Sequence, residues 1–153
     1  MEVYRISKKD RAKRLSSSGS ANRWNYDGQM VIYAGSSRSL SSLELIVHSN
    51  AVKPKIEYRV MVISIDDSDH LVKQVIVSDL PNNWRLRAAY RDLQVIGANW
   101  YNRQESLILK VPSAVIPMEN NFIINTEHPE YRNCVHLIRL EDSFWDERIL
   151  KRF

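Results

Sequence analysis

The sequence predicts an α+β fold, in which short strands and a few helices are mixed without a regular alternation. Three observations support this class. Short apolar and β-branched runs are scattered along the chain. Two other segments repeat apolar residues at helical spacing. Only four glycines occur, and none belongs to a Gly-x-Gly-x-x-Gly or P-loop pattern, which argues against a doubly wound nucleotide-binding sheet.

The first third of the chain begins with a predicted strand over residues 3–6. The charged run 8–15 can form a helix, and a Ser/Gly-rich loop follows at 16–20. The apolar run 30–34 predicts a short buried strand. Ser36 and Ser37 then offer an N-cap, which marks the start of a helix.

That helix carries two faces of interest. Leu40, Leu43 and Val47 follow each other at helical spacing and form its predicted apolar face. Glu44 and His48 lie one turn apart on a neighbouring face. The helix is therefore expected to hold one carboxylate rigidly beside the core.

The middle of the chain predicts a hairpin followed by a helix. Residues 56–65 are rich in β-branched side chains, and a second strand is expected over 71–77 after the acidic break at 66–69. Leu93, Ile96 and Trp100 then recur at helical spacing, with Gly97 as a point of close packing.

The last third of the chain predicts three short strands, over residues 107–111, 122–124 and 135–140. A short helix or tail follows over 144–153. No internal repeat and no linker divides the sequence, so we expect a single domain over 1–153.

Composition narrows the class of protein further. The only cysteine is Cys134, which excludes an internal disulfide and suits a reducing cytosol. No apolar run reaches the roughly 20 residues that span a bilayer, and the N-terminus lacks the apolar core of a signal peptide. We therefore expect a cytoplasmic protein that does not enter a membrane.

The formal net charge of +4 is compatible with nucleic acid, a small polyanionic substrate or an acidic protein partner. The basic run at 8–14 lacks interleaved aromatic residues, so a solvated face is favoured over direct nucleic-acid binding. The four histidines form no His-Glu-x-x-His pattern, and Glu44 with His48 lacks an evident third ligand. We expect no metal site.

Three polar residues in separate local contexts carry a further signal. Arg23 lies in Asn-Arg-Trp-Asn, Glu44 in Leu-Glu-Leu-Ile-Val-His, and Ser113 in Val-Pro-Ser-Ala-Val-Ile-Pro. In this order and spacing they resemble the RES-domain family, whose name denotes an arginine, a glutamate and a serine. The similarity extends from residues 4–6 to residues 144–148 and includes 31–34, 80–81, 121–125 and 128–129.

The resemblance implies a fold akin to ADP-ribosyltransferases, with two small β-sheets around an NAD cleft and flanking helices. It also implies a toxin of a bacterial toxin–antitoxin pair that degrades NAD⁺, by phosphorolysis or by hydrolysis. NAD⁺ would then be the substrate, inorganic phosphate a co-substrate in the first case, and no resident cofactor is expected. Implied partners are a helix-turn-helix, Xre-like antitoxin and a second copy of the chain in a homodimer.

The residue types suit this chemistry. Nicotinamide leaves NAD⁺ as a neutral molecule and needs no general acid, so one carboxylate, Glu44, is enough to stabilise the cationic ribose. Arg23 and Arg5 are candidates for the pyrophosphate because guanidinium groups bind phosphate oxygens bidentately. Ser113 could contact a ribose or an incoming phosphate, and Tyr33 could stack on the nicotinamide ring.

Each of these assignments has a structural alternative. Glu44 could be a surface residue, Arg23 and Arg5 could form ion pairs, Ser113 could cap a turn, and Tyr33 could be a core residue. Asn121 and Asn125, beside an apolar strand, are expected to anchor turns.

Three other functions stay open at the level of the sequence. The closest is transfer of ADP-ribose to a protein, which shares the first half of the reaction. A basic nucleic-acid-binding domain or ribonuclease toxin comes from another class and depends only on the charge. A non-catalytic interaction module with the same fold is the third.

Overall fold

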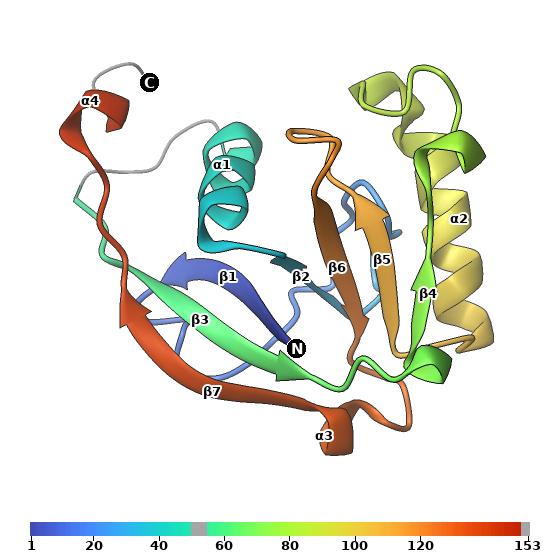
Figure 1. The fold of residues 1–153 in the computed structure, drawn as a ribbon, viewed down its shortest axis with the longest axis horizontal. Helices are drawn as coiled ribbons and strands as arrows, with labels where there is room; N and C mark the ends of the chain where they lie inside the picture. Colours follow the sequence, from blue (N-terminus) through green and yellow to red (C-terminus); the bar gives the residue numbers. More distant parts are fainter. Residues whose placement is uncertain (50–54, 151–153) are drawn as a thin grey trace.

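The computed structural model describes residues 1–49 and 55–150 and contains one seven-stranded sheet with helices on its faces (Figure 1). The strands are β1 (Glu2–Lys8), β2 (Val31–Gly35), β3 (Tyr58–Ile65), β4 (Val72–Gln74), β5 (Ile108–Pro112), β6 (Asn120–Asn125) and β7 (Val135–Asp142). The helices are α1 (Arg38–Ser49), α2 (Tyr90–Arg103), α3 (Tyr131–Cys134) and α4 (Glu147–Leu150), with 3₁₀ turns η1 (Asp69–Leu71), η2 (Val77–Asp79) and η3 (Arg87–Ala89). The predicted α+β class is confirmed.

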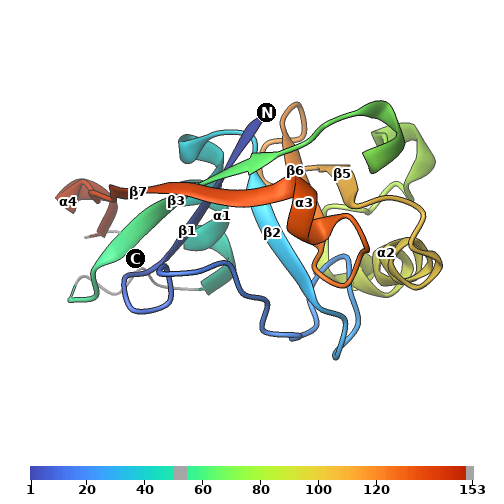
Figure 2. The same ribbon diagram turned by 90° about the horizontal axis from the view of Figure 1, so that it is seen from below.

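The sheet is built as two halves. Its strand order is β4-β5-β6-β2-β1-β3-β7, and only the β4–β5 pair is parallel. Strands β1 and β2 pair at one position, Tyr4 with Gly35, whereas β1 and β3 pair over seven. The two sheets expected from the resemblance are therefore present as halves of one sheet that diverge at this single contact (Figure 2).

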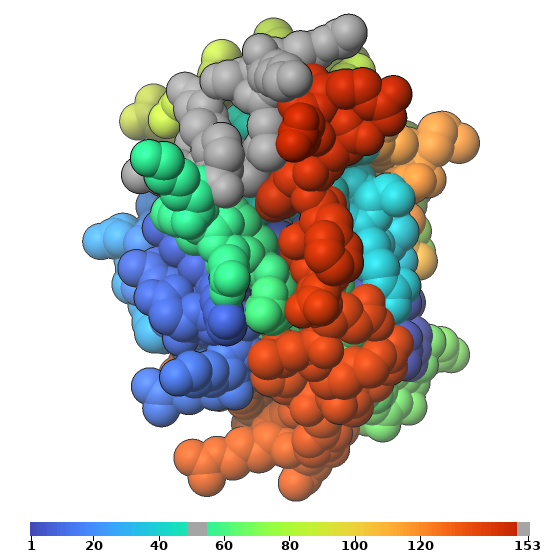
Figure 3. All heavy atoms as spheres, turned by 90° about the vertical axis from the view of Figure 1, so that its left-hand side faces the viewer, coloured from blue at the N-terminus to red at the C-terminus, as the bar shows by residue number. Residues whose placement is uncertain are grey.

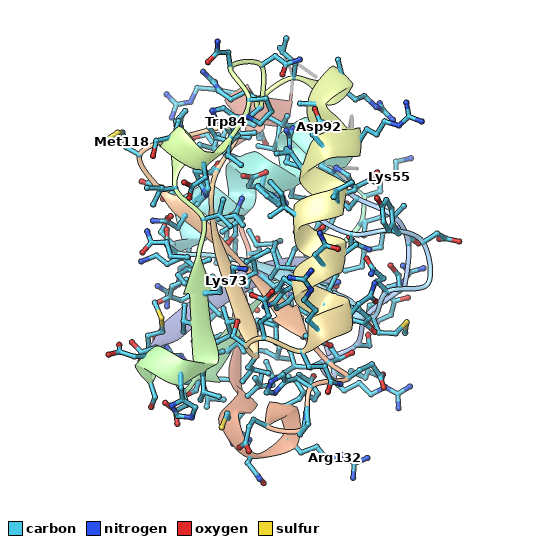
Figure 4. The ribbon with its side chains drawn as sticks, turned by 90° about the vertical axis from the view of Figure 1, so that its right-hand side faces the viewer. Lys55, Lys73, Trp84, Asp92, Met118 and Arg132 are labelled. Atoms are coloured by element: carbon cyan, nitrogen blue, oxygen red, sulfur yellow. The ribbon has the colours of Figure 1, made fainter. Side chains whose placement is uncertain are left out.

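Helix α2 covers one face of the β5-β6-β2 half. Alternate residues of these strands point toward it, and Trp100 of α2, 1% exposed, packs in the same cluster as Leu109 and Ile123. The intervening residues, such as Ile108 and Ile124, belong to the cluster on the opposite face. Figure 4 shows α2 along this side of the molecule, with Trp84 and Asp92 at the end where the β5–β6 connection, tipped by Met118, also lies.

Helix α1 covers the other half and begins as predicted. The Ser37 hydroxyl accepts a hydrogen bond from the Leu40 backbone N–H at 3.0 Å, which is an N-cap. The predicted apolar face is only partly correct, because Leu40 is 1% exposed while Leu43 and Val47 are 40% and 60% exposed. Ile46 is buried instead, in a cluster with strand residues of β1 and β3.

A close contact between small residues fixes how helix α1 is rotated about its own axis on the sheet. The Ser41 hydroxyl donates to the Tyr4 carbonyl at 2.7 Å, which fixes the helix on β1. A Cβ at Gly35 would lie 2.6 Å from that hydroxyl, so only glycine allows β2 to approach so closely. This docking turns the Glu44 face of the helix toward β2 and β6.

One predicted helix and one predicted strand pairing are wrong. Residue 8 ends β1 and residues 9–13 form turns, so the predicted helix over 8–15 is absent, and Ala12 is the one buried residue in this segment. Like charges three and four residues apart disfavour a helix there. Strand β4 does not form a hairpin with β3. It pairs in parallel with β5 at the opposite edge of the sheet, because η1 and the preceding acidic segment carry the chain across.

The remaining predicted strands are confirmed at β5, β6 and β7, with boundaries that differ by a few residues. The predicted C-terminal helix is present as α4, and residues 151–153 of that prediction lie outside the described residues. In the described part of the chain, no helix combines the length and apolar character needed to cross a membrane.

Candidate active site

A cleft of about 750 Å³ lies between α1, the ends of β2 and β6, and the segment that leads into α2. Glu44 is the only acidic side chain among the described residues that line it. The same lining contains four arginines: Arg5, Arg23, Arg85 and Arg87. The cleft therefore combines one carboxylate with a strongly cationic wall, which favours a negatively charged ligand.

Glu44 is half-buried and held by two donors. Its Oε1 atom accepts hydrogen bonds from the Ser113 hydroxyl at 2.7 Å and from the Asn121 side-chain amide at 2.6 Å. Hydrogen bonds to an ionised acceptor are stronger than neutral ones. Two of them on one oxygen fix the orientation of the carboxylate and leave its second oxygen for the cleft.

Ser113 is fully buried, at 0% exposure, and lies behind the carboxylate. Its hydroxyl donates to Glu44 and also accepts from the backbone N–H groups of Val115 and Ile116, both at 3.0 Å. The hydroxyl is thus fully occupied inside the protein. This geometry makes Ser113 a residue that positions Glu44, and differs from the expected contact with a ribose or a phosphate.

Asn121 is a site residue that sequence reasoning assigned to a turn. It is the second residue of β6, and the β5–β6 pairing sets it opposite Val111, two residues before Ser113. This register brings both donors to the same carboxylate. The signal available in the sequence was that Ser113 directly follows one short apolar strand and Asn121 directly precedes the next.

Arg23 lies on the opposite side of the cleft and is already oriented. Its guanidinium donates to the Trp84 carbonyl at 2.8 Å and to the Arg85 carbonyl at 3.2 Å. It also lies over the Tyr90 ring, 4.6 Å from the ring centroid. None of these partners is a carboxylate, so the positive charge of Arg23 remains available to an anion.

The turn that carries Arg23 is held by Tyr33 of β2 and by helix α2. The Tyr33 hydroxyl donates to the Asn25 side chain at 2.6 Å and accepts from the Trp24 backbone N–H at 3.1 Å. On α2, the absence of a side chain at Gly97 is essential, because a Cβ there would lie 1.7 Å from the Trp24 carbonyl oxygen. The prediction that Gly97 is a point of close packing is confirmed.

Tyr33 is therefore a bracing residue whose ring also lines the cleft. Its hydroxyl is engaged on both sides, and burial raises the pKa of the phenol well above its usual value. The hydroxyl stays protonated and serves as a structural donor. Stacking of the ring on nicotinamide stays a prediction.

Arg5 reaches the cleft from β1. Its guanidinium donates to the Ser16 carbonyl at 3.0 Å, and burial lowers its pKa.

Arg85 and Arg87, which sequence reasoning missed, come from the exposed segment before α2. Arg85 donates to the Ala114 carbonyl at 2.9 Å and so joins this segment to the residue after Ser113.

No group of three or more His, Cys, Asp or Glu side chains within residues 1–49 and 55–150 could hold a metal ion. The cleft instead offers guanidinium groups, an oriented carboxylate and an aromatic ring. Such a set can bind phosphate oxygens and stabilise positive charge that develops next to the carboxylate.

Fold and cleft together define an α+β protein in which a cationic cleft surrounds a single oriented carboxylate. The RES domain family model matches residues 2–146, and the chain belongs to this family. It is 35% identical over 127 residues to the "Toxin Res" of Yersinia enterocolitica, covering 83% of this chain and 82% of that protein.

Two further similarities extend the comparison. The chain is 30% identical over 145 residues to the "Prs ADP-ribosylating toxin" of a Sphingobium species, covering 92% of this chain and 89% of the relative. In fold it resembles the crystal structure of the M. tuberculosis MbcT–MbcA toxin–antitoxin complex. The TM-score is 0.73 at 18% identity, over 93% of this chain and 83% of that chain.

Proposed function

We propose that this protein is the toxin of a toxin–antitoxin pair and that it cleaves the nicotinamide–ribose bond of NAD⁺. The observation that carries the proposal is the half-buried Glu44, held by Ser113 and Asn121 in a cleft walled by arginines. Membership of the RES family and the names of the relatives from Yersinia and Sphingobium support it.

In the proposed reaction, the bond between ribose C1′ and the nicotinamide nitrogen breaks. The bonding electrons move to the pyridinium ring, so nicotinamide leaves as a neutral molecule and positive charge develops on the ribose. The free oxygen of Glu44 stabilises that charge, while the arginines hold the pyrophosphate. An acceptor then bonds to C1′. Water loses a proton and gives ADP-ribose, whereas phosphate gives ADP-ribose phosphate.

The nature of the acceptor separates three versions of this function. Phosphorolysis and hydrolysis differ in product, and transfer to a protein is a second candidate favoured by the name of the Sphingobium relative. Incubation of the protein with NAD⁺, with and without inorganic phosphate and with cell extract, distinguishes them. The products are ADP-ribose phosphate, ADP-ribose or a modified protein band.

Glu44→Gln tests the carboxylate itself. Glutamine can present its oxygen to both donors, so we expect the melting temperature to stay close to that of the wild type. The rate of NAD⁺ loss should fall by about 10²–10³-fold, because one preorganised charge is removed from the transition state. Normal turnover by this variant would mean that Glu44 is not the catalytic carboxylate.

We also propose that an antitoxin of the Xre-like, helix-turn-helix type regulates the protein by covering the cleft. The cationic wall favours a carboxylate-bearing element in that position. Competition binding is the test: NAD⁺ should weaken binding of the antitoxin, and simultaneous binding with unchanged affinities would exclude the cleft as the interface.

The homodimer stays a prediction, which light scattering of the purified protein tests.

A further inference from the structure

A second pocket, of about 580 Å³, adjoins the cleft. Arg5, Ile6 and Leu45 line both cavities, so the two are adjacent beside α1, and together they are called the trough here. The floor of the second pocket is apolar. Its largest side chains, Tyr58 and Met61, are 6% and 1% exposed. This volume lies in the range of small-molecule sites, about 300–1,000 Å³.

The rim of this pocket is cationic and carries hydroxyl groups. Four basic side chains line it, Arg5, Lys8, Arg11 and Arg14, together with serines 16–18. No acidic residue occurs among the described residues of the lining.

The basic residues that face the pocket differ from their neighbour outside it. Lys9 forms an ion pair with Glu57 at 2.7 Å. By contrast, no carboxylate in residues 1–49 and 55–150 lies within ion-pair distance of Lys8, Arg11 or Arg14. Like charges that converge without a counterion repel each other, and a bound anion relieves this repulsion.

We propose that this pocket receives the adenosine end of the dinucleotide and binds a phosphate group on the adenosine ribose. This inference rests on the proposed function, in which the nicotinamide ribose lies at Glu44. The apolar floor suits a purine base, and Arg5, between the two cavities, suits the pyrophosphate. The dinucleotide then extends from Glu44 along the trough toward Arg11 and Arg14.

The number of basic side chains favours a ligand that carries an additional phosphate on its adenosine ribose. The pyrophosphate carries two negative charges, and the cleft already offers Arg5, Arg23, Arg85 and Arg87. Lys8, Arg11 and Arg14 are additional to these and lie in the pocket for the far end of the ligand. A phosphate on the adenosine ribose, as in NADP⁺, supplies the negative charge that these three cations lack.

The test is a titration with ligands that cannot be cleaved at the nicotinamide bond. Calorimetry compares ADP-ribose with 2′-phospho-ADP-ribose in phosphate-free buffer, for the wild type, the Arg11→Ala/Arg14→Ala double variant and the matched control Lys13→Ala. Lys13 is an exposed cation of the same segment that does not line the pocket. A second double variant, Arg11→Gln/Arg14→Gln, removes the same charges but keeps long polar side chains. Its melting curve shows whether it is folded, so a loss of binding can be separated from a loss of folding.

We expect the wild type and Lys13→Ala to bind the phosphorylated ligand about tenfold tighter or more, as one charge-assisted contact allows. Both double variants should lose this preference and keep their affinity for ADP-ribose within a few-fold. Equal affinities in the wild type, or a preference that survives in the double variants, overturns the inference. Because neither ligand contains nicotinamide, that result is independent of the assay for NAD⁺ loss, which tests the proposed function.

Discussion

At the level of single residues, the candidate site consists of one carboxylate, the side chains that orient it and the surrounding arginines. Glu44 faces the cleft, whereas Ser113 lies behind it with no exposed surface. Three hydrogen bonds use the Ser113 hydroxyl completely. In the proposed reaction, a serine in this position would act by orienting Glu44, and it also holds two backbone N–H groups, so its loss and the loss of Asn121 should have different consequences.

Asn121→Ala removes one of the two hydrogen bonds that the Glu44 carboxylate accepts. We expect kcat for NAD⁺ loss to fall by about 10–10²-fold, because a carboxylate that is displaced or mobile stabilises the transition state less well. KM should change little, since Asn121 orients the carboxylate without holding the pyrophosphate. The neighbouring Asn120→Ala is the control. A change confined to KM would place Asn121 in substrate binding instead.

Ser113→Ala should affect stability as well as kcat. The partly buried backbone N–H groups of Val115 and Ile116 lose their acceptor, and loss of such a hydrogen bond costs about 0.5–1.5 kcal/mol. Denaturant unfolding of this variant and of Asn121→Ala compares the two. Equal stabilities would mean that the turn does not depend on the serine.

Arg23→Lys keeps the charge but cannot reproduce the fork that reaches two backbone carbonyls and lies over Tyr90. We expect NAD⁺ to bind more weakly, by roughly tenfold or more, because the cation is no longer oriented toward the cleft. Arg91→Lys, an exposed position on α2, is the matched control. Wild-type affinity in Arg23→Lys would show that positive charge alone is sufficient.

At the scale of elements, the site depends on close approaches that only glycine permits. Helix α2 contacts the turn at Trp24 through Gly97, and β2 contacts α1 through Gly35. The first contact supports Arg23 and the second supports Glu44. The two sides of the cleft are thus set by two close contacts, one made by each of the two long helices.

Gly97→Ala tests the first of these contacts. The added Cβ would lie 1.7 Å from the Trp24 carbonyl oxygen, so α2 or the turn must move. We expect a loss of about 1–3 kcal/mol in the free energy of unfolding, as for other overpacked sites, together with weaker NAD⁺ binding. Asn99→Ala, on the exposed face of the same helix, should be neutral or slightly stabilising. Undiminished stability in Gly97→Ala would contradict the close contact.

At the scale of the whole molecule, a surface charge network joins segments from both ends of the chain. Arg38 at the start of α1 donates two hydrogen bonds of 2.7 Å to Glu141 of β7. Arg139 also donates to Glu141, at 3.0 Å, and pairs with Glu2 of β1 at 3.2 Å. Figure 3 shows β7 running along this face beside β3.

This network predicts a dependence of stability on acid pH. Hydrogen bonds from Arg38 are the largest cause that lowers the pKa of Glu141, from 4.5 to about 2. A carboxyl with a lowered pKa stabilises the fold above its unfolded pKa, and this contribution is lost as pH falls through about 2. Glu141→Gln should therefore have a modestly lower Tm than the wild type near neutral pH.

The difference in Tm between the wild type and Glu141→Gln should narrow below about pH 4.5 and vanish near about pH 2. Thermal unfolding followed by circular dichroism across this range measures it. Asp10→Asn, at an exposed carboxyl without an ion-pair partner in the described residues, is the control. A difference that stays constant down to about pH 2 would assign the effect of Glu141 to something other than its charge.

Much of the fold could be predicted because its signals are local. Apolar runs marked all seven strands at or near their positions, Ser37 marked the start of α1, and the spacing of Leu93 and Trp100 marked α2. The resemblance to the RES family identified Arg23, Glu44 and Ser113 because each lies in its own short motif.

Which of these segments meet could be seen only in the folded structure. A short apolar strand does not specify its partner, so β4 was expected beside β3 and lies beside β5 at the far edge of the sheet. Likewise, the rotation of α1 follows from its docking on β1 and Gly35, not from its own apolar spacing.

The same distinction holds for the site. The sequence by itself determined the residue types, and hence the chemistry of one carboxylate among guanidinium groups. Which of them face the cleft depends on contacts between residues far apart in the chain, such as Glu44 with Ser113 and Asn121. Those contacts form through the packing of α1 against two halves of a sheet, so Asn121, Arg85 and Arg87 became site residues only in the folded molecule.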